Sequence, residues 1–172
     1  VIGLLSILYP QIYDQRIVTR IADLEKQHGS LNPAVALTIA EEVAKERFCK
    51  FTSHLEAIEA GIRIAMAYLT LGYVSSPIEG FIQLKINKTA KGEDYFAPYY
   101  SGPIRSAGGS EAAFSLVVVD YLRELFGYVR YDPTDTILSP NYKLSYWIDI
   151  AKTIEDFSIA FPLEKENILY FF

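Results

Sequence analysis

The sequence predicts an α+β fold, with N-terminal helices packed on a β-hairpin or small antiparallel sheet, followed by a glycine-rich loop and a helix. Three observations predict this arrangement. Apolar residues recur at helical spacing over roughly the first 70 positions, they alternate with polar residues at 81–86, and glycines cluster at 102–109. The length of 172 residues, with 51% hydrophobic and 22% charged residues, suits one globular domain.

Two helices are predicted ahead of residue 48, each with an apolar face. The face of the first, over 13–27, consists of Ile17, Ile21 and Leu24. In the second, Val35, Ile39, Val43 and Arg47 fall on one side. Gly29 is a natural end for the first helix. Asn32 can cap the second, and Pro33 suits its first position because the missing N–H has no intrahelical partner there.

A third helix is predicted from Ser53 to about Gly72. Ser53 and Glu56 have the spacing of a capping box, in which each side chain binds the other residue's backbone N–H. Its apolar stripe consists of Leu55, Ile58, Ile62, Met66 and Leu69. Because alanines occupy the other faces, we expect this helix to be buried on more than one side.

A hairpin is predicted next, since the apolar period changes from helical spacing to strict alternation. Residues 81–86 place Ile82, Leu84 and Ile86 on one face, which we expect to be buried, and 87–92 form the loop. The returning strand, 95–100, is rich in aromatic residues, namely Tyr95, Phe96, Tyr99 and Tyr100. This row has two interpretations, as hairpin core or as a stacking surface for unpaired bases, and hairpin core is the more common one.

The glycine-rich loop spans 101–109 and leads into a helix predicted over 111–126, with Ser110 as its cap and Gly127 as its stop. The predicted inner face of that helix consists of Leu116, Val119 and Leu122 with Arg123.

The loop residues Arg105, Gly108, Gly109 and Ser110 form the candidate site. A glycine-rich turn before a helix exposes backbone N–H groups, and an arginine adds donors that suit phosphate, including the phosphate of a nucleic acid. The same features also serve close packing, and the structural interpretation is the stronger on the residues alone. Neither a Walker A pattern nor Gly-x-Gly-x-x-Gly spacing is present.

Composition argues against several classes of protein. A net charge of −5 and a pI near 5.1 disfavour a basic nucleic-acid surface over the whole chain, although a local basic contact stays open. Cys49 is the only cysteine and His28 and His54 are the only histidines, so we expect no structural zinc site. No apolar run approaches a membrane span, and we expect no membrane partner. The first residue is Val1, which leads us to expect a fragment.

The remaining reactive residue types are expected to be structural. Asp120 and Glu124 lie one turn apart, and with Arg123 between them they fit a solvated helix face better than a metal site. Cys49 is expected to fill a small space in the core. His54 is expected on the surface at a helix start.

Residues 102–109 read Gly-Pro-Ile-Arg-Ser-Ala-Gly-Gly. This string closely resembles a signature near the N-terminus of the large subunit of archaeal family D DNA polymerase. Further blocks in matching order strengthen the resemblance, at 60–63, 73–80, 120–123 and 131–134. The resemblance covers about 17–134 and is firmest over 55–134. It implies that residues 1–134 form the N-terminal domain of that subunit.

Residues 135–172 depart from the family. The family continues into a charged helix at this point, whereas Pro140 would break a helix here. We therefore expect a divergent tail, from a truncated or frame-disrupted reading frame or a split gene.

The resemblance implies a role in archaeal DNA replication in the cytoplasm. The complete subunit is a DNA-directed DNA polymerase, a nucleotidyltransferase that uses magnesium, contains zinc modules and works on DNA with a small subunit carrying a proofreading exonuclease. The catalytic carboxylates and zinc modules lie downstream in the family. We therefore assign no catalytic residue, metal or cofactor to this chain and expect it to be inactive alone, as an accessory module.

Two other classes of function remain open. The first is a protein-interaction domain without nucleic-acid contact, which the acidic net charge favours. The second is a free-standing small-molecule enzyme that uses the glycine-rich loop. It is the weakest because no general base stands next to the loop.

Overall fold

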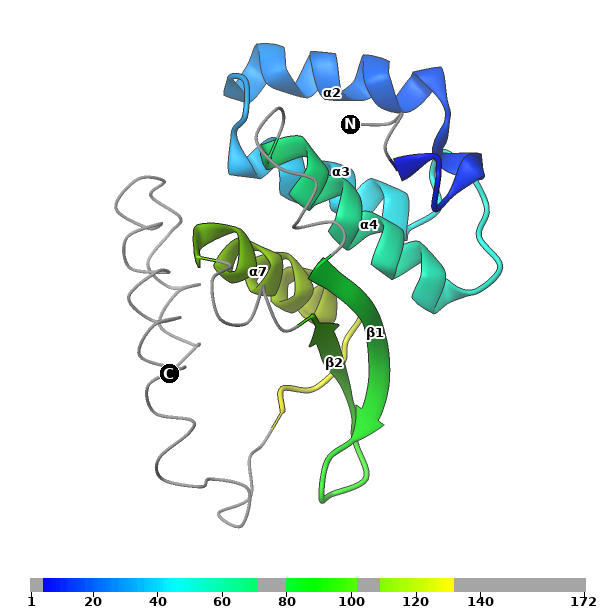
Figure 1. The fold of residues 1–172 in the computed structure, drawn as a ribbon, viewed down its shortest axis with the longest axis vertical. Helices are drawn as coiled ribbons and strands as arrows, with labels where there is room; N and C mark the ends of the chain where they lie inside the picture. The colour runs from blue at the N-terminus through cyan, green and yellow to red at the C-terminus, as the bar shows by residue number, and fades with distance from the viewer. Residues whose placement is uncertain (1–4, 71–79, 102–108, 132–172) are drawn as a thin grey trace.

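The computed structural model describes residues 5–70, 80–101 and 109–131, with side chains from residue 113 onward in the last range. The predicted α+β class is confirmed (Figure 1). After a short 3-10 helix, η1 (Pro10–Ile12), the elements are α2 (Gln15–His28), α3 (Pro33–Ala44), α4 (His54–Leu69), β1 (Phe81–Lys88), β2 (Asp94–Tyr100) and α7 (Gly109–Leu125).

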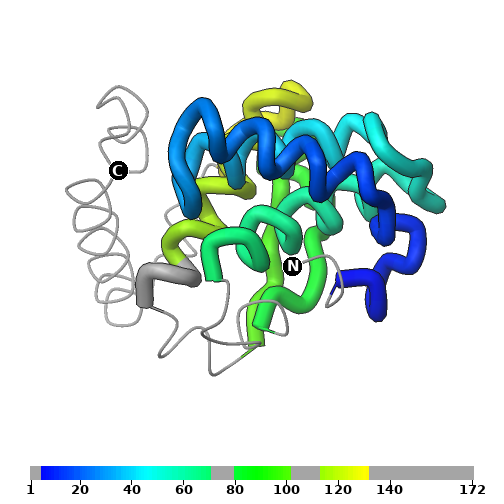
Figure 2. Tube along the Cα trace, turned by 90° about the horizontal axis from the view of Figure 1, so that it is seen from above, coloured from blue at the N-terminus to red at the C-terminus, as the bar shows by residue number. Residues whose placement is uncertain are grey.

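The helices form successive layers over the hairpin. Helix α2 packs on α3, α3 packs on α4, and α7 contacts α3, α4 and β2. The two strands run beneath the helices when the molecule is seen from above (Figure 2). The core therefore lies between α3, α4, α7 and one face of the hairpin, and α4 is buried on several sides as predicted. Its buried residues include Ala57, Ile58, Ala60, Ile62, Ala65, Met66 and Ala67.

The three N-terminal helices start at short polar side chains. Asn32 and Ser53 accept hydrogen bonds from the N–H groups of Ala34 and Glu56, so both predicted caps are confirmed. The capping box is only partly confirmed, because the Glu56 carboxylate accepts from Thr52 N–H at 2.7 Å rather than from Ser53. The first helix begins at Gln15, two residues later than predicted, after its cap Asp14.

Helix α4 ends at Leu69, so the predicted end at Gly72 is wrong. The backbone N–H and the hydroxyl of Thr70 both donate to the Met66 carbonyl, at 3.0 and 2.8 Å. Thr70 is the C-cap residue of α4, and these two bonds satisfy the Met66 carbonyl in the last turn of the helix.

The hairpin is antiparallel as predicted, but its predicted buried face is wrong. Leu84 is buried, whereas Ile82 and Ile86 are exposed. The register shifts between Phe81 and Gln83, which makes Ile82 the additional residue of a β-bulge and turns its side chain out of the regular alternation. Pro98 lies opposite Leu84, where its missing N–H leaves one donor fewer on the outer edge of β2.

Helix α7 begins at Gly109, so Ser110 lies inside its first turn rather than before it. At the other end Gly127, with φ of 75°, donates to the Glu124 carbonyl, and Tyr128 N–H donates to Arg123. This left-handed cap confirms the predicted stop. The buried stripe follows Phe114, Val118, Val119 and Leu122. Leu116 is only half-buried, contrary to prediction.

Candidate functional site

The predicted glycine-rich site lies largely outside the described residues. Arg105 and Gly108 belong to the undescribed range, and Gly109 and Ser110 are described only as the first two backbone positions of α7.

Both ends of the loop are held at the base of the hairpin. Ser101 N–H donates to the Gly80 carbonyl at 2.9 Å, which extends the pairing of the two strands by one step. The Tyr100 hydroxyl lies 2.7 Å from the Ser115 hydroxyl of α7. The residues that enter and leave the loop are thus fixed against each other, on β2 and on α7.

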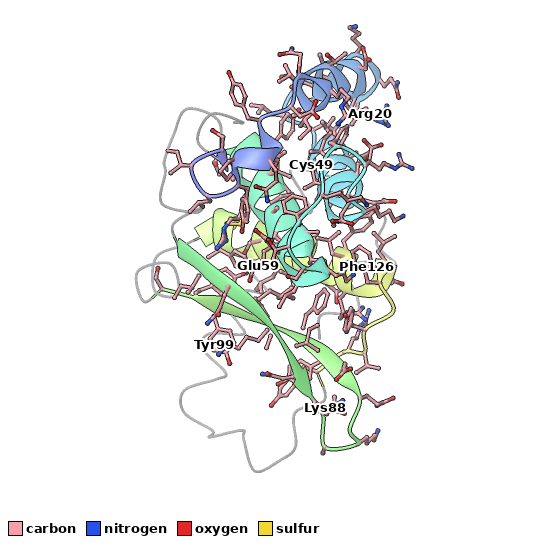
Figure 3. All side chains as sticks on the ribbon, turned by 90° about the vertical axis from the view of Figure 1, so that its right-hand side faces the viewer. Arg20, Cys49, Glu59, Lys88, Tyr99 and Phe126 are labelled. Carbon is pink, nitrogen blue, oxygen red and sulfur yellow. The ribbon has the colours of Figure 1, made fainter. Side chains whose placement is uncertain are left out.

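Beside the loop, two charged side chains of α4 cover the free edge of β1. Glu59 accepts a hydrogen bond from Leu84 N–H at 2.6 Å, and Arg63 donates to the Ile82 carbonyl at 2.8 Å. Glu59 lies between α4 and the hairpin (Figure 3). The two backbone groups are those that a third strand would use, so this helix blocks strand addition at this edge.

Arg63 is an unusual buried cation. Its residue is 7% exposed, and its guanidinium lies 4.6 Å from the centroid of the Phe81 ring. Within the described part of the chain, Nε and Nη1 have no hydrogen-bond partner. The sequence signal was two charges, Glu59 and Arg63, spaced one turn apart in the otherwise apolar segment 57–69, and the pattern alone did not reveal their target on β1.

The outer face of the hairpin, away from the helices, carries an exposed aromatic residue. Tyr99 is 41% exposed, and Figure 3 shows it on the side of the strands opposite the helices. The ammonium of Lys85 lies 5.0 Å from the centroid of its ring, within cation–π range. Ile82, at the bulge of β1, is 51% exposed.

The structure divides the predicted aromatic row between two faces. Phe96 is buried against Tyr128, with ring centroids 4.4 Å apart, and Tyr100 faces α7 through Ser115. Tyr95 and Tyr99 lie opposite Asn87 and Gln83 of β1. They occupy the alternate positions of β2, whose side chains lie on the outer face. The hairpin-core interpretation therefore holds for half of the row.

A buried carboxylate joins the first two helices. Glu42 is 4% exposed and receives hydrogen bonds from Arg20 at 2.9 Å and from Arg47 at 3.0 Å. Both arginines keep part of their side chains in solvent. Two cations therefore compensate one buried anion, which ties α2 to α3.

Two tyrosines bind carboxylates across elements. Burial and then the hydrogen bond to Glu25 raise the pKa of Tyr68 to about 12, while the same bond lowers the pKa of Glu25. Burial and the hydrogen bond to Glu41 raise the pKa of Tyr121 further still. Burial alone would raise the pKa of Glu41, but hydrogen bonds from Lys45 and Tyr121 outweigh it and lower that pKa.

The other reactive side chains have structural surroundings. Asp120 accepts from Arg123 Nε at 2.6 Å, as a helix-face ion pair. Exposed His54 packs edge-on against the Phe126 ring, and burial raises the pKa of half-buried Cys49. Among the described residues, no group of three or more His, Cys, Asp or Glu side chains is placed to hold a metal ion. No helix in the same ranges has the length and apolar character to cross a membrane.

The family model and the relatives that match this chain all belong to one family. Residues 10–143 match the family model described as DNA polymerase II large subunit DP2, N-terminal. The chain is 39% identical over 131 residues to the DNA polymerase II large subunit of Nanoarchaeum equitans, covering 76% of this chain and 10% of that protein. It is 47% identical over 98 residues to the subunit of Methanococcoides burtonii, covering 57% of this chain and 9% of that protein.

A third relative, the DNA polymerase II large subunit of Thermococcus kodakarensis, is 40% identical over 121 residues, which cover 69% of this chain and 7% of that protein. The chain thus spans about a tenth of the length of the curated relatives that it matches. The match to the family model also runs nine residues past Thr134.

Proposed function

Since this chain belongs to the family of the N-terminal region of the DNA polymerase II large subunit DP2, we propose that it acts as a non-catalytic accessory module in archaeal DNA replication. The observation that supports this proposal is the match of residues 10–143 to a region that is N-terminal in the family. The proposal assigns templated nucleotide addition to the complete subunit, in the cytoplasm, together with DNA and a small proofreading subunit.

The proposal also assigns the metals of the complete subunit to other regions. Magnesium and zinc need clustered carboxylates or Cys and His ligands, and the described residues do not fit such a set. Several of their acidic side chains are already engaged in the fold. Glu42 binds two arginines, Glu59 binds a backbone N–H of β1, and Asp120 binds Arg123. We therefore derive no reaction step through a metal here.

The module would organise the subunit through its rigid parts. The described helices stack into a continuous core, and α4 holds the hairpin by its edge. Both ends of the glycine-rich loop are anchored to that frame. We propose a structural role for Arg105 in this loop, since acidic residues outnumber Lys and Arg by 21 to 16 in this chain and offer partners for a guanidinium.

The test is reconstitution of a truncated relative. The Nanoarchaeum equitans large subunit, with the matched N-terminal tenth deleted, would be mixed with its small subunit and this chain. We expect co-elution in gel filtration and recovered primer extension with magnesium, while this chain alone extends no primer. The deleted region of the relative, added back as a separate chain, is the positive control. If that region restores activity and this chain neither binds nor restores it, the proposal is wrong.

A second function, a protein-interaction domain without nucleic-acid contact, has one observation in its favour. Large apolar side chains are exposed near the N-terminal end, including Tyr13 at 76%, and the chain carries a net charge of −5. Such a domain would bind DNA weakly or not at all. The salt dependence of DNA binding separates the two functions, because phosphate contacts release counterions and give a steep slope.

A further inference from the structure

We propose that the outer face of the β1–β2 hairpin, formed around Tyr99 and Lys85, is a contact site for single-stranded DNA. This inference rests on the proposed function, because it names the partner that one surface of the module meets. The site consists of strand residues and does not include the glycine-rich loop that follows β2. Its residues come from both strands, where Tyr99 lies opposite Gln83 and Lys85 lies opposite Ala97.

The first observation is the exposed aromatic ring on a strand. Tyr99 faces away from the helices and pairs with Gln83 of β1, whose amide offers both donors and acceptors (Figure 3). Proteins that bind single strands without sequence preference present aromatic rings on which bases stack, with cations nearby that follow the phosphates. Lys85 stands 5.0 Å from the ring centroid and supplies that cation.

The second observation is that Lys85 has no ion pair within the described residues, unlike Lys88, which pairs with Asp94 at 2.8 Å. The cation–π contact holds the ammonium beside the ring without neutralising its charge. A phosphate next to a stacked base would therefore meet an exposed, uncompensated positive charge.

The third observation is a local reversal of charge. Residues 81–100 and 128–131 carry four basic side chains against two acidic ones, whereas the whole chain has a net charge of −5. The basic residues are Lys85, Lys88, Lys91 and Arg130. A local positive potential on an acidic chain steers a polyanion to this ribbon and away from the helices. Charge complementarity therefore favours a polyanion, and the exposed Tyr99 ring favours one that carries unpaired bases, which is single-stranded DNA.

The fourth observation is that the platform is rigid before any strand binds. Leu84 and Phe96 bury the inner face of the ribbon, and Glu59 and Arg63 hold its edge. A preorganised ring loses little conformational entropy when a base stacks on it. An unpaired base is the fitting partner, because both faces of a paired base are covered by its neighbours in the duplex.

The experiment is fluorescence anisotropy with a labelled dT20 oligonucleotide and the full 172-residue chain, from 50 to 200 mM KCl. We expect saturable binding that weakens with salt. Tyr99→Ala should weaken it roughly 10-fold, because stacking on one ring supports about that factor. Tyr99→Phe, which keeps the ring, should bind like the unchanged chain. Lys85→Ala should flatten the salt slope by about 0.7, the value for one phosphate contact on a single strand.

Two matched controls carry the same substitutions away from the hairpin. Tyr13→Ala removes an exposed tyrosine, and Lys26→Ala removes an exposed lysine of α2. Neither should change affinity or slope. Absence of binding by the unchanged chain, or equal losses in the control and hairpin variants, would overturn the inference. The reconstitution test is independent, because Tyr99→Ala should still co-elute with the truncated subunit, so failure of one proposal leaves the other standing.

Discussion

Gly61 of α4 lies so close to Ala40 of α3 that a Cβ atom at position 61 would stand 2.6 Å from the Ala40 carbonyl oxygen. The same atom would stand 3.3 Å from the Ala44 Cβ. Only glycine permits this approach, because the obstacle is backbone and cannot rotate away. The contact brings α4 against α3 and so sets the position of the helix that holds the hairpin.

Gly61→Ala should therefore destabilise the chain by about 1–3 kcal/mol, the usual cost of overpacking a tight interface. Helix propensity alone gives the opposite expectation, since alanine favours a helix by roughly 1 kcal/mol over glycine. Urea unfolding followed by circular dichroism measures the difference. A variant more stable than the parent would show that the two helices can separate without cost.

Glu59→Ala should cost about 1–3 kcal/mol, because it leaves the buried Leu84 N–H without an acceptor. Glu59→Gln is the matched variant, since its amide oxygen can still accept the bond, and it should cost clearly less. The midpoints of urea unfolding compare the two. Equal losses in both variants would mean that the charge of Glu59, rather than its acceptor, stabilises the edge of β1.

Arg20→Ala and Arg47→Ala should each cost roughly 1 kcal/mol or less, because the other arginine still compensates Glu42. The double variant should lose about 3–5 kcal/mol, since a buried carboxylate is then left without a cation. The expected signature is a double loss larger than the sum of the single losses. Additive losses in a double-mutant cycle would contradict the shared compensation.

Tyr68 makes stability sensitive to alkaline pH. The unfolded phenol loses its proton near pH 10.0, whereas the folded pKa is about 12. A raised folded pKa gives stability that is complete below pH 10 and is lost as pH rises towards 12. Tyr68→Phe should therefore show a shallower fall in unfolding free energy between pH 10 and 12. Parallel curves for the parent and the variant would contradict the link to this phenol.

Substitution of Arg105 tests the proposal that this residue has a structural role in the glycine-rich loop. If it pairs with an internal carboxylate, Arg105→Ala should lower the free energy of unfolding by roughly 3–5 kcal/mol, since a buried partner would lose its counter-charge. The salt slope of DNA binding should stay unchanged. A stable variant whose slope flattens by about one unit would instead assign Arg105 to a DNA phosphate.

Local sequence patterns predicted the features whose hydrogen bonds close within a few residues. Asn32 and Ser53 cap their helices, and Gly29 and Gly127 end theirs, as expected. These interactions depend on neighbours along the chain, so they are encoded locally. The end of α4 at Leu69 lies three residues before Gly72, and the glycine spacing alone did not predict it.

The candidate surfaces were less predictable than the helices. The aromatic row at 95–100 was visible in the sequence, but its division into buried Phe96 and exposed Tyr99 depends on which face the helices cover. The bulge at Ile82 changes the alternation of buried and exposed side chains along β1, and no residue pattern predicted it. The Glu59 and Arg63 contacts join residues about 20 or more positions apart, beyond the reach of a local pattern.

The sequence by itself determined the α+β class, the order of the described helices and strands, the antiparallel hairpin and the resemblance to the polymerase family. Only the tertiary structure decided which side of the hairpin meets the helices, where Arg63 is buried and how the Gly61 backbone approaches α3. The periodicity of apolar residues predicts which face of a helix or strand is apolar. Whether that face is buried depends on which other element packs against it. That element comes from a distant part of the chain, through packing that no short stretch of sequence contains.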